Sequence, residues 1–174
     1  MTSSKSSSTY LVDNFIVEFD RALRSVVGST PMRRAVPAPA NLSEATSETS
    51  LTEKNLLAEF GARGVDASRV FFAGRLPRSE YLSRYRIADL FLDTSPYNAG
   101  TTASDALWAG LPVLTFLGNT FSSRVCASLL TAIGLPGLIC NSQNEYEELA
   151  ITLGLDSNRY DSIKGRLAEN RLTT

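Results

Sequence analysis

A loop rich in hydroxyl, amide and glycine groups joins a short apolar strand to a helix, and it holds the residues best suited to chemistry. The strand is predicted at 90–92, the loop follows from Asp93, and the helix begins near Thr102. A strand that passes through a glycine-containing turn into a helix directs free backbone N–H groups and the positive end of the helix dipole at one point. Gly100 lets the backbone approach a ligand closely, while Thr101 and Thr102 offer hydroxyl and amide donors together. The loop therefore predicts an anion site that suits a diphosphate.

The same residues also have a purely structural interpretation. Thr102 and Asp105 have the spacing of a capping box, Thr-x-x-Asp, which stabilises a helix start without any ligand. The two roles are compatible, because Asp105 can still accept a hydrogen bond from a sugar hydroxyl.

Two arginines and an aromatic residue follow an earlier apolar run. Arg75 and Arg78 flank Leu76-Pro77, so one guanidinium group can reach the same anion, although surface arginines are usually only solvated. Tyr81 offers an aromatic face for a flat base, with simple packing as the alternative. Arg84 lies one helical turn further on and shares that face.

Composition excludes several kinds of chemistry. The 174 residues include 17 basic and 18 acidic side chains and no histidine. A net charge of −1 gives no broad positive field, so nucleic acid is not an expected partner and an anion site must be built locally. The absence of histidine excludes Ser-His-Asp and Cys-His catalysis. Cys126 and Cys140 lie in apolar stretches without CxxC spacing, so no metal site is expected.

Other motifs and segments are missing as well. Neither GxGxxG nor GxxxxGK[ST] occurs, which argues against a dehydrogenase and a P-loop enzyme. A carboxylate pair for glycoside hydrolysis is a weak alternative, because nothing in the spacing of Asp89, Asp93 and Asp105 sets two of them across a bond. No stretch approaches the roughly 18 apolar residues of a membrane span, and the serine-rich start has no apolar leader, so a cytoplasmic protein without a membrane segment is expected.

The chain divides into three predicted parts. Residues 1–28 have a polar start followed by apolar residues at three- and four-residue steps, which predicts an amphipathic helix over 11–26 that needs a partner surface. Residues 29–50 are rich in Pro, Ser, Thr and Ala and are predicted to be a flexible linker. Residues 51–174 form the predicted domain.

Within this domain, short apolar runs alternate with helical patterns. A first helix begins at a capping box of Ser50 and Glu53 and ends near Gly61. The later strands are predicted at 70–73, 90–92, 112–116 and 138–140, and the later helices at 79–88, 102–109, 122–133, 144–153 and 156–170. The alternation predicts an α/β fold, a Rossmann-like parallel sheet with helices on both faces. Ligands of such sheets bind beyond the carboxyl ends of the strands, where the loops 73–79, 93–102 and 117–122 emerge.

One long stretch resembles a known family. Residues 97–115, YNAGTTASDALWAGLPVLT, are similar to the C-terminal catalytic region of the protein O-GlcNAc transferase family, including its bacterial tetratricopeptide-bearing members. The similarity extends back through 69–78 and forward through 121–125, 134–136 and 144–147. The resemblance implies the second nucleotide-binding half of a B-type glycosyltransferase. It also implies UDP-N-acetylglucosamine as donor substrate rather than a cofactor, a protein Ser or Thr hydroxyl as acceptor, and no metal.

The resemblance also assigns roles to individual positions. Thr101 and Thr102 match the family's diphosphate-binding threonines, and Asp105 matches its ribose-side aspartate. Arg78 stands where relatives have a lysine near the ribose and phosphate. Leu76 stands where a backbone group meets the uracil.

Three further matched positions concern the base and the phosphate. Tyr81 stands where a histidine often stacks on the base, so a stacking face is kept while a titratable nitrogen is lost. Arg84 matches an arginine that lies beside this histidine in relatives. Gly100 stands where some relatives carry a histidine, so one phosphate contact of those relatives is absent.

The resemblance leaves the catalytic residues unknown, because the family's other Rossmann half, its cleft histidine and its phosphate-binding lysine are not matched in this sequence. Two hypotheses follow: a piece of an O-GlcNAc-transferase-like enzyme, or a non-catalytic nucleotide-sugar or protein-binding module. The donor sugar also stays open, since related plant enzymes are fucosyltransferases.

Overall fold

The computed structural model describes residues 7–12, 15–20, 51–62, 67, 70–72, 76–95 and 98–173. Its strands are β1 (Ser7–Val12), β2 (Phe15–Asp20), β3 (Val70–Phe72), β4 (Leu90–Leu92), β5 (Val113–Phe116) and β6 (Ile139–Cys140). Its helices are α1 (Leu51–Ala62), α2 (Arg78–Arg84), α3 (Thr101–Trp108), α4 (Ser122–Ala132), α5 (Gln143–Leu155) and α6 (Ser157–Asn170), with short 3₁₀ turns η3 (Tyr85–Ile87) and η4 (Pro136–Leu138). The predicted linker at 29–50 lies outside the described residues.

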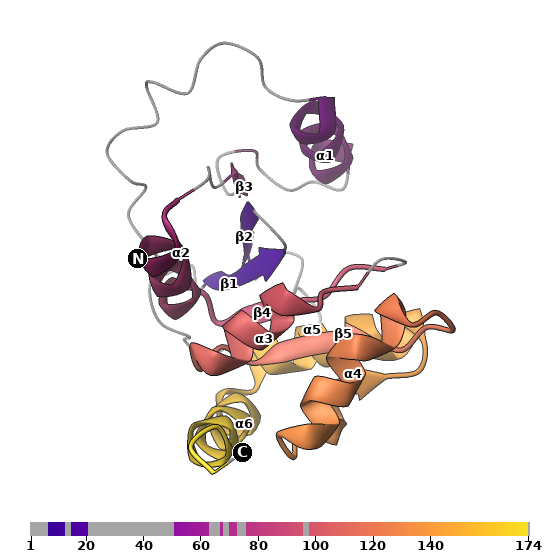
Figure 1. Cartoon of the computed structure of the whole chain (residues 1–174). Coiled ribbons are helices and arrows are strands. Elements are labelled where there is room, and N and C mark those ends of the chain that lie inside the picture. The colour runs from indigo at the N-terminus through magenta and orange to yellow at the C-terminus, as the bar shows by residue number, and fades with distance from the viewer. Residues whose placement is uncertain are drawn as a thin grey trace, which may run out of the picture.

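The part of the sheet that bears the helices is parallel. The strands lie in the order β3-β2-β1-β4-β5-β6, and β4 pairs with β5 and β5 with β6 in parallel register, with Phe91 opposite Val113 and Thr115 opposite Ile139. α3 and α4 cover one face of these strands and α5 covers the other (Figure 1). The predicted Rossmann-like α/β fold is therefore confirmed.

The amino-terminal segment is a β-hairpin, so the helix predicted over 11–26 is wrong where the structure describes it. β1 pairs antiparallel with β2, with Val12 opposite Phe15, and the hairpin lies between β3 and β4. The sequence of these strands is rich in β-branched and aromatic residues, which favour strands, and the two residues that join them are Asp13 and Asn14, of types common in tight turns. The sheet is therefore mixed at this end, because β2 runs antiparallel to its neighbours.

Two helices end at glycines that turn the chain back into the sheet. Gly110 has φ 84° and Gly134 has φ 73°, conformations that residues with a side chain adopt only with strain. The next N–H, of Leu111 or Leu135, returns to the carbonyl five residues earlier at 2.9 and 2.8 Å, which is the Schellman pattern. Both leucines are buried, so each turn also adds a side chain to the core.

The core is built where small residues let helices approach the strands. α3 buries Ala103, Ala106 and Leu107, a stripe at i, i+3 and i+4. The largest side chains that are almost fully buried come from all layers: Phe91, Leu111, Val113, Leu114, Leu130, Leu135, Leu138, Leu153 and Leu167. This packing fixes α3 firmly against β4 and β5.

α6 and the residue after it close the amino-terminal edge of the parallel strands. Three side chains donate to carbonyls just before these strands: Tyr160 to Asp89 (2.8 Å), Arg166 to Gly134 (2.6 Å) and Arg171 to Trp108 (3.1 Å). The opposite, carboxyl edge is the one where α3 begins. Among the helices that the structure describes, none has the length and apolar character needed to span a bilayer.

Candidate functional site

The start of α3 lies at the carboxyl edge of the sheet, as predicted. Gly100 is the N-cap residue, and a glycine has no side chain with which to cap the helix start. Thr102 lies two positions inside the helix, so the structure does not support the capping-box alternative for Thr102 and Asp105. Thr101 is exposed and Thr102 is half-buried. The first-turn amides and two hydroxyls are therefore gathered at an uncapped helix start.

Gly100 stands at the helix start without a positive φ and, in the part of the chain that the structure describes, without a close neighbour for a side chain. Its φ is −108°, which any residue can adopt. Among the described residues, a Cβ at this position would contact the Val125 side chain alone, at 3.7 Å. A glycine here keeps the helix start open to a close approach.

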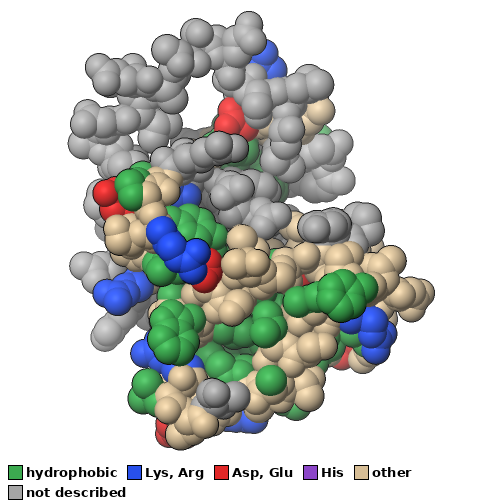
Figure 2. Space-filling model, in the orientation of Figure 1, with side chains coloured by type: hydrophobic (Ala, Val, Ile, Leu, Met, Phe, Trp, Pro, Cys, Tyr) green, Lys and Arg blue, Asp and Glu red, His purple; other side chains and the backbone are tan. Residues whose placement is uncertain are grey.

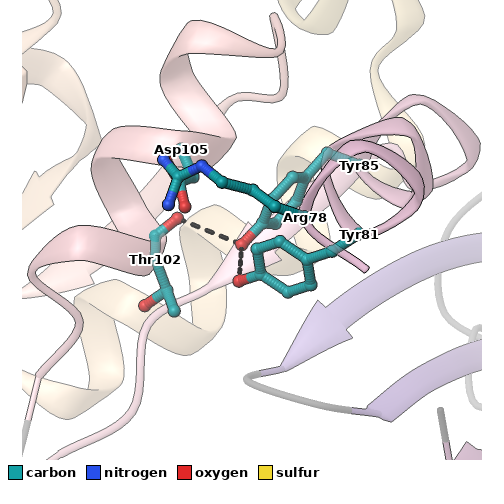
Figure 3. A network of polar contacts seen from close by, with 5 residues as sticks. All are labelled: Arg78, Tyr81, Tyr85, Thr102 and Asp105. Atoms are coloured by element: carbon teal, nitrogen blue, oxygen red, sulfur yellow. Dashed lines mark hydrogen bonds and ion pairs between the residues drawn. The ribbon is translucent and has the colours of Figure 1, made fainter. Parts of the chain in front are cut away.

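Arg78 and Asp105 meet across α2 and α3. The Arg78 guanidinium donates to Asp105 Oδ1 at 3.3 Å, with 75% of the Arg78 side chain exposed and 16% of Asp105 exposed. Figure 3 shows Arg78 extending from α2 over Asp105 beside Thr102. The structure thus brings these three predicted site residues into one cluster.

Two tyrosines complete this cluster. The hydroxyls of Tyr81 and Tyr85 hydrogen-bond to each other, and the Tyr85 hydroxyl donates to the Thr102 carbonyl oxygen over a long 3.4 Å (Figure 3). The two rings form an edge-to-face pair with centroids 5.3 Å apart. The Arg84 guanidinium carbon lies 6.0 Å from the centroid of the Tyr81 ring, at the limit of a cation–π contact. Tyr85 had not been predicted from the sequence, although its i+4 spacing from Tyr81 places both on one helix face.

Leu76 lies apart from the cluster in the contacts that the structure describes. It precedes α2 and its side chain is 44% exposed. None of the contacts among the described residues joins it to the cluster of Arg78, Tyr81, Tyr85, Thr102 and Asp105.

A buried polar network holds the loop that leads into α3, and the sequence did not predict it. Asp93 Oδ1 accepts from the Ala99 N–H at 2.6 Å, and Oδ2 accepts from the Asn98 amide at 2.8 Å and the Thr115 hydroxyl at 2.6 Å. Asp93, Asn98 and Thr115 are at most 3% exposed. The Tyr146 hydroxyl, whose pKa is raised by burial and then by the Asp93 charge, donates to the Asp93 carbonyl oxygen at 3.0 Å. The carboxylate therefore sets the path of the chain into Gly100.

The carboxylate pair considered for glycoside hydrolysis does not form. Asp93 is buried and its oxygens are occupied, while Asp89 lies at the other end of β4, where its carbonyl accepts from Tyr160. Asp105 lies on α3 beside Arg78. No two of the three carboxylates face one ligand position.

Both cysteines are shielded thiols. Burial, followed by the nearby Asp93 charge, raises the pKa of Cys126 from 9.0 to about 12. Burial, followed by Glu145, raises the pKa of Cys140 from 9.0 to about 11. Both are therefore protonated near neutral pH, and a protonated thiol is a poor nucleophile.

We expect iodoacetamide at pH 8 to leave both thiols unmodified in the native chain and to modify both in concentrated urea. Unfolded thiols ionise near pH 9.0, whereas the folded ones keep their protons to higher pH. Unfolding then releases protons, so the free energy of unfolding should fall as pH rises above 9, by up to about 1.4 kcal/mol per thiol and pH unit. Rapid native labelling of Cys126 at pH 8, measured by mass spectrometry, would contradict this assignment.

The surface bears no broad charged patch on the face drawn in Figure 2. Lys and Arg side chains there are scattered among hydrophobic and other atoms. A hollow of about 660 Å³ lies between α2, the end of α3 and α6, lined in part by Arg86, Trp108 and Lys164. It contains none of the predicted site residues, so the candidate site is the cluster at the start of α3.

The chain matches the family model described as glycosyl transferase family 41 over residues 48–174. A probable UDP-N-acetylglucosamine–peptide N-acetylglucosaminyltransferase of Arabidopsis thaliana is 39% identical over 113 residues, which cover 64% of this chain and 12% of the relative. A UDP-N-acetylglucosamine–peptide N-acetylglucosaminyltransferase of Giardia intestinalis is 40% identical over 104 residues, which cover 59% of this chain and 7% of the relative.

A solved structure agrees with these sequence matches. A mutant of the Thermobaculum terrenum O-GlcNAc transferase superposes with a TM-score of 0.66 at 33% identity, covering 69% of this chain and 23% of that one. The chain thus spans about a tenth of the two relatives' length and about a quarter of the solved chain. The resemblance found in the sequence is confirmed, and this chain belongs to glycosyl transferase family 41.

Proposed function

We propose that this chain is the sugar-nucleotide-binding part of a protein O-GlcNAc transferase-type enzyme, with UDP-N-acetylglucosamine as donor and protein Ser or Thr hydroxyls as acceptors. The observation that carries the proposal is the uncapped start of α3 beside Arg78 and Asp105. The names of the relatives, which are peptide N-acetylglucosaminyltransferases that use UDP-N-acetylglucosamine, support the choice of donor and acceptor.

The diphosphate would bind at the start of α3. The first-turn N–H groups and the hydroxyls of Thr101 and Thr102 supply donors, and the positive end of the helix dipole adds to them. In sugar transfer, negative charge grows on the departing diphosphate, so fixed donors at this position stabilise the transition state. This is the chain's main proposed contribution to the reaction.

Arg78 and Asp105 would exchange partners when the nucleotide binds. Their ion pair is largely exposed on the arginine side, so it contributes little and is readily opened. Arg78 then pairs with a phosphate oxygen, and Asp105 accepts from a ribose hydroxyl. Tyr81 offers its ring to the base, with Arg84 beside it and the backbone at Leu76 at the edge of the base.

Calorimetric titration with UDP tests the binding part of the proposal. Wild type should bind, and Arg78→Ala should weaken binding by roughly tenfold, because one charge-assisted contact to a phosphate is lost. Arg159→Ala, an exposed arginine on α6 at the opposite edge, is the matched control and should bind as wild type does. A folded wild-type chain that binds no UDP would refute the proposal.

Transfer of radiolabelled N-acetylglucosamine to protein acceptors separates the two hypotheses about activity. Transfer that is lost in Asp105→Ala supports an enzyme. Binding of UDP without transfer supports a nucleotide-sugar-binding module, which the small share of the relatives' length covered by this chain favours for the chain alone. A cytoplasmic location and a link to tetratricopeptide repeats stay predictions from the sequence.

A further inference from the structure

We propose that Tyr85 is a positioning residue for nucleotide binding: its hydroxyl joins Tyr81 to the first turn of α3 and so holds the base-stacking ring in register with the diphosphate site. This role rests on the proposed function. It adds Tyr85, to which the family resemblance assigned no role. Figure 3 shows the two tyrosine hydroxyls directed toward Thr102.

α2 lies at the surface of the core, which it contacts through the half-buried side chains of Tyr81 and Leu82. None of its residues is buried, although it carries Arg78, Tyr81 and Arg84, three of the predicted site residues. Tyr85, which follows α2 directly, is 2% exposed, and its ring lies 6.4 Å from that of Phe91 in the core. Tyr85 therefore anchors the end of α2 to the sheet.

The hydrogen-bond chain has one consistent direction. The Thr102 carbonyl can only accept, so the Tyr85 hydroxyl donates to it. The Tyr85 oxygen then accepts from the Tyr81 hydroxyl, so both tyrosine hydroxyl protons are used in hydrogen bonds within the protein. Tyr81 is thus held at its hydroxyl end and offers a ligand its ring rather than a donor.

The Tyr85 hydroxyl matters more for the position of the Tyr81 ring than for the position of α3. α3 is fixed by its buried alanines and by the Asp93 network at the preceding loop, whereas the Tyr81 ring is only half-buried. The 3.4 Å contact to Thr102 is also long, so its removal alters the helix start little. Loss of the Tyr85 hydroxyl therefore removes the hydrogen bond that fixes the hydroxyl end of Tyr81, keeps the packing of the Tyr81 ring, and leaves the diphosphate site in place.

The test compares the affinity for UDP with that for inorganic pyrophosphate in the 174-residue chain. In Tyr85→Phe, the dissociation constant for UDP should rise about fivefold, the effect of one hydrogen bond, while that for pyrophosphate changes less than twofold. A merely structural role would change both constants together or neither. Phenylalanine keeps the ring in the core, so the variant should fold, which thermal unfolding checks.

Two further variants complete a double-mutant cycle. Tyr81→Phe removes the same tyrosine–tyrosine bond from the other side, so it should give the same loss for UDP, and the double variant should lose no more. Tyr160→Phe is the matched control, because it removes another half-buried hydroxyl-to-carbonyl bond, on α6, together with an acceptor for Lys164, and should leave UDP affinity unchanged. Additive losses in the double variant would overturn the proposal.

The outcomes also distinguish the role of Tyr85 from the proposed binding of UDP at the start of α3. A wild-type chain that is folded and binds no UDP overturns both. A wild type that binds UDP, with a Tyr85→Phe variant that keeps the wild-type ratio of the two dissociation constants, overturns the role of Tyr85 alone.

Discussion

Asp93→Asn should lower the free energy of unfolding by about 3 kcal/mol, although it replaces one side chain with another of the same shape. The carboxylate accepts from the Ala99 N–H, the Asn98 amide and the Thr115 hydroxyl. An asparagine offers one acceptor oxygen in place of two, and its own NH₂ group then opposes one of these donors. Buried donors left without an acceptor cost roughly 1–3 kcal/mol each, and hydrogen bonds to a charged acceptor are the stronger kind.

Urea unfolding measures this loss, and Asp156→Asn is the control. Asp156 is an exposed N-cap of α6 that accepts from the Arg159 N–H at 3.0 Å, and asparagine caps helices equally well, so a change of less than about 0.5 kcal/mol is expected. A loss below about 1 kcal/mol in Asp93→Asn would mean that water or rearranged side chains replace the buried acceptor.

One buried oxygen of the Asp93 network has no hydrogen-bond partner among the described residues. This oxygen is Asn98 Oδ1, while the amide nitrogen of the same side chain donates to Asp93 and to the Phe116 carbonyl. An unpaired buried acceptor is costly and uncommon in native proteins. The Asn98 amide nitrogen links Asp93, which follows β4, to the Phe116 carbonyl at the end of β5.

The sequence predicted the position of the helix start at the carboxyl edge well, because local rules govern it. An apolar strand, a glycine and two threonines before a helical stripe define a helix start whatever the rest of the chain does. α3 begins at Thr101, one residue before its predicted start, and Arg78 and Asp105 meet beside it. These features depend on residues close in sequence, or on the regular return of each strand to the same edge.

The features that were missed depend on contacts between distant residues. Thr115 and Tyr146 meet Asp93 only once the sheet is assembled, so nothing in their local sequence marks them. The segment 11–20 carries apolar residues at three- and four-residue steps, which fit a helix face, yet pairing with β3 and β4 makes it a hairpin. The strand-favouring residue types of this segment, together with its pairing in the sheet, outweighed the helical spacing of its apolar residues.

A double Thr101→Val and Thr102→Val variant should bind UDP about 100-fold more weakly than wild type, with little change in stability. Valine has nearly the shape of threonine but no hydroxyl, so each change removes one charge-assisted donor to a phosphate oxygen, worth roughly 1.5 kcal/mol. Thr101 is exposed and Thr102 is only half-buried, which limits the effect on folding. Calorimetric titration measures the affinity, and the backbone amides of α3 account for the binding that remains.

Thr131→Val with Thr152→Val is the matched control for this variant. These two hydroxyls donate to carbonyls within their own helices, at 2.9 and 2.7 Å, on α4 and α5. The control pair should therefore bind UDP as wild type does, although it changes the same number of threonines to valines. If the Thr101 and Thr102 pair behaves like the control, the two hydroxyls do not touch the nucleotide, and the amides and dipole of α3 would have to hold the diphosphate with Arg78 alone.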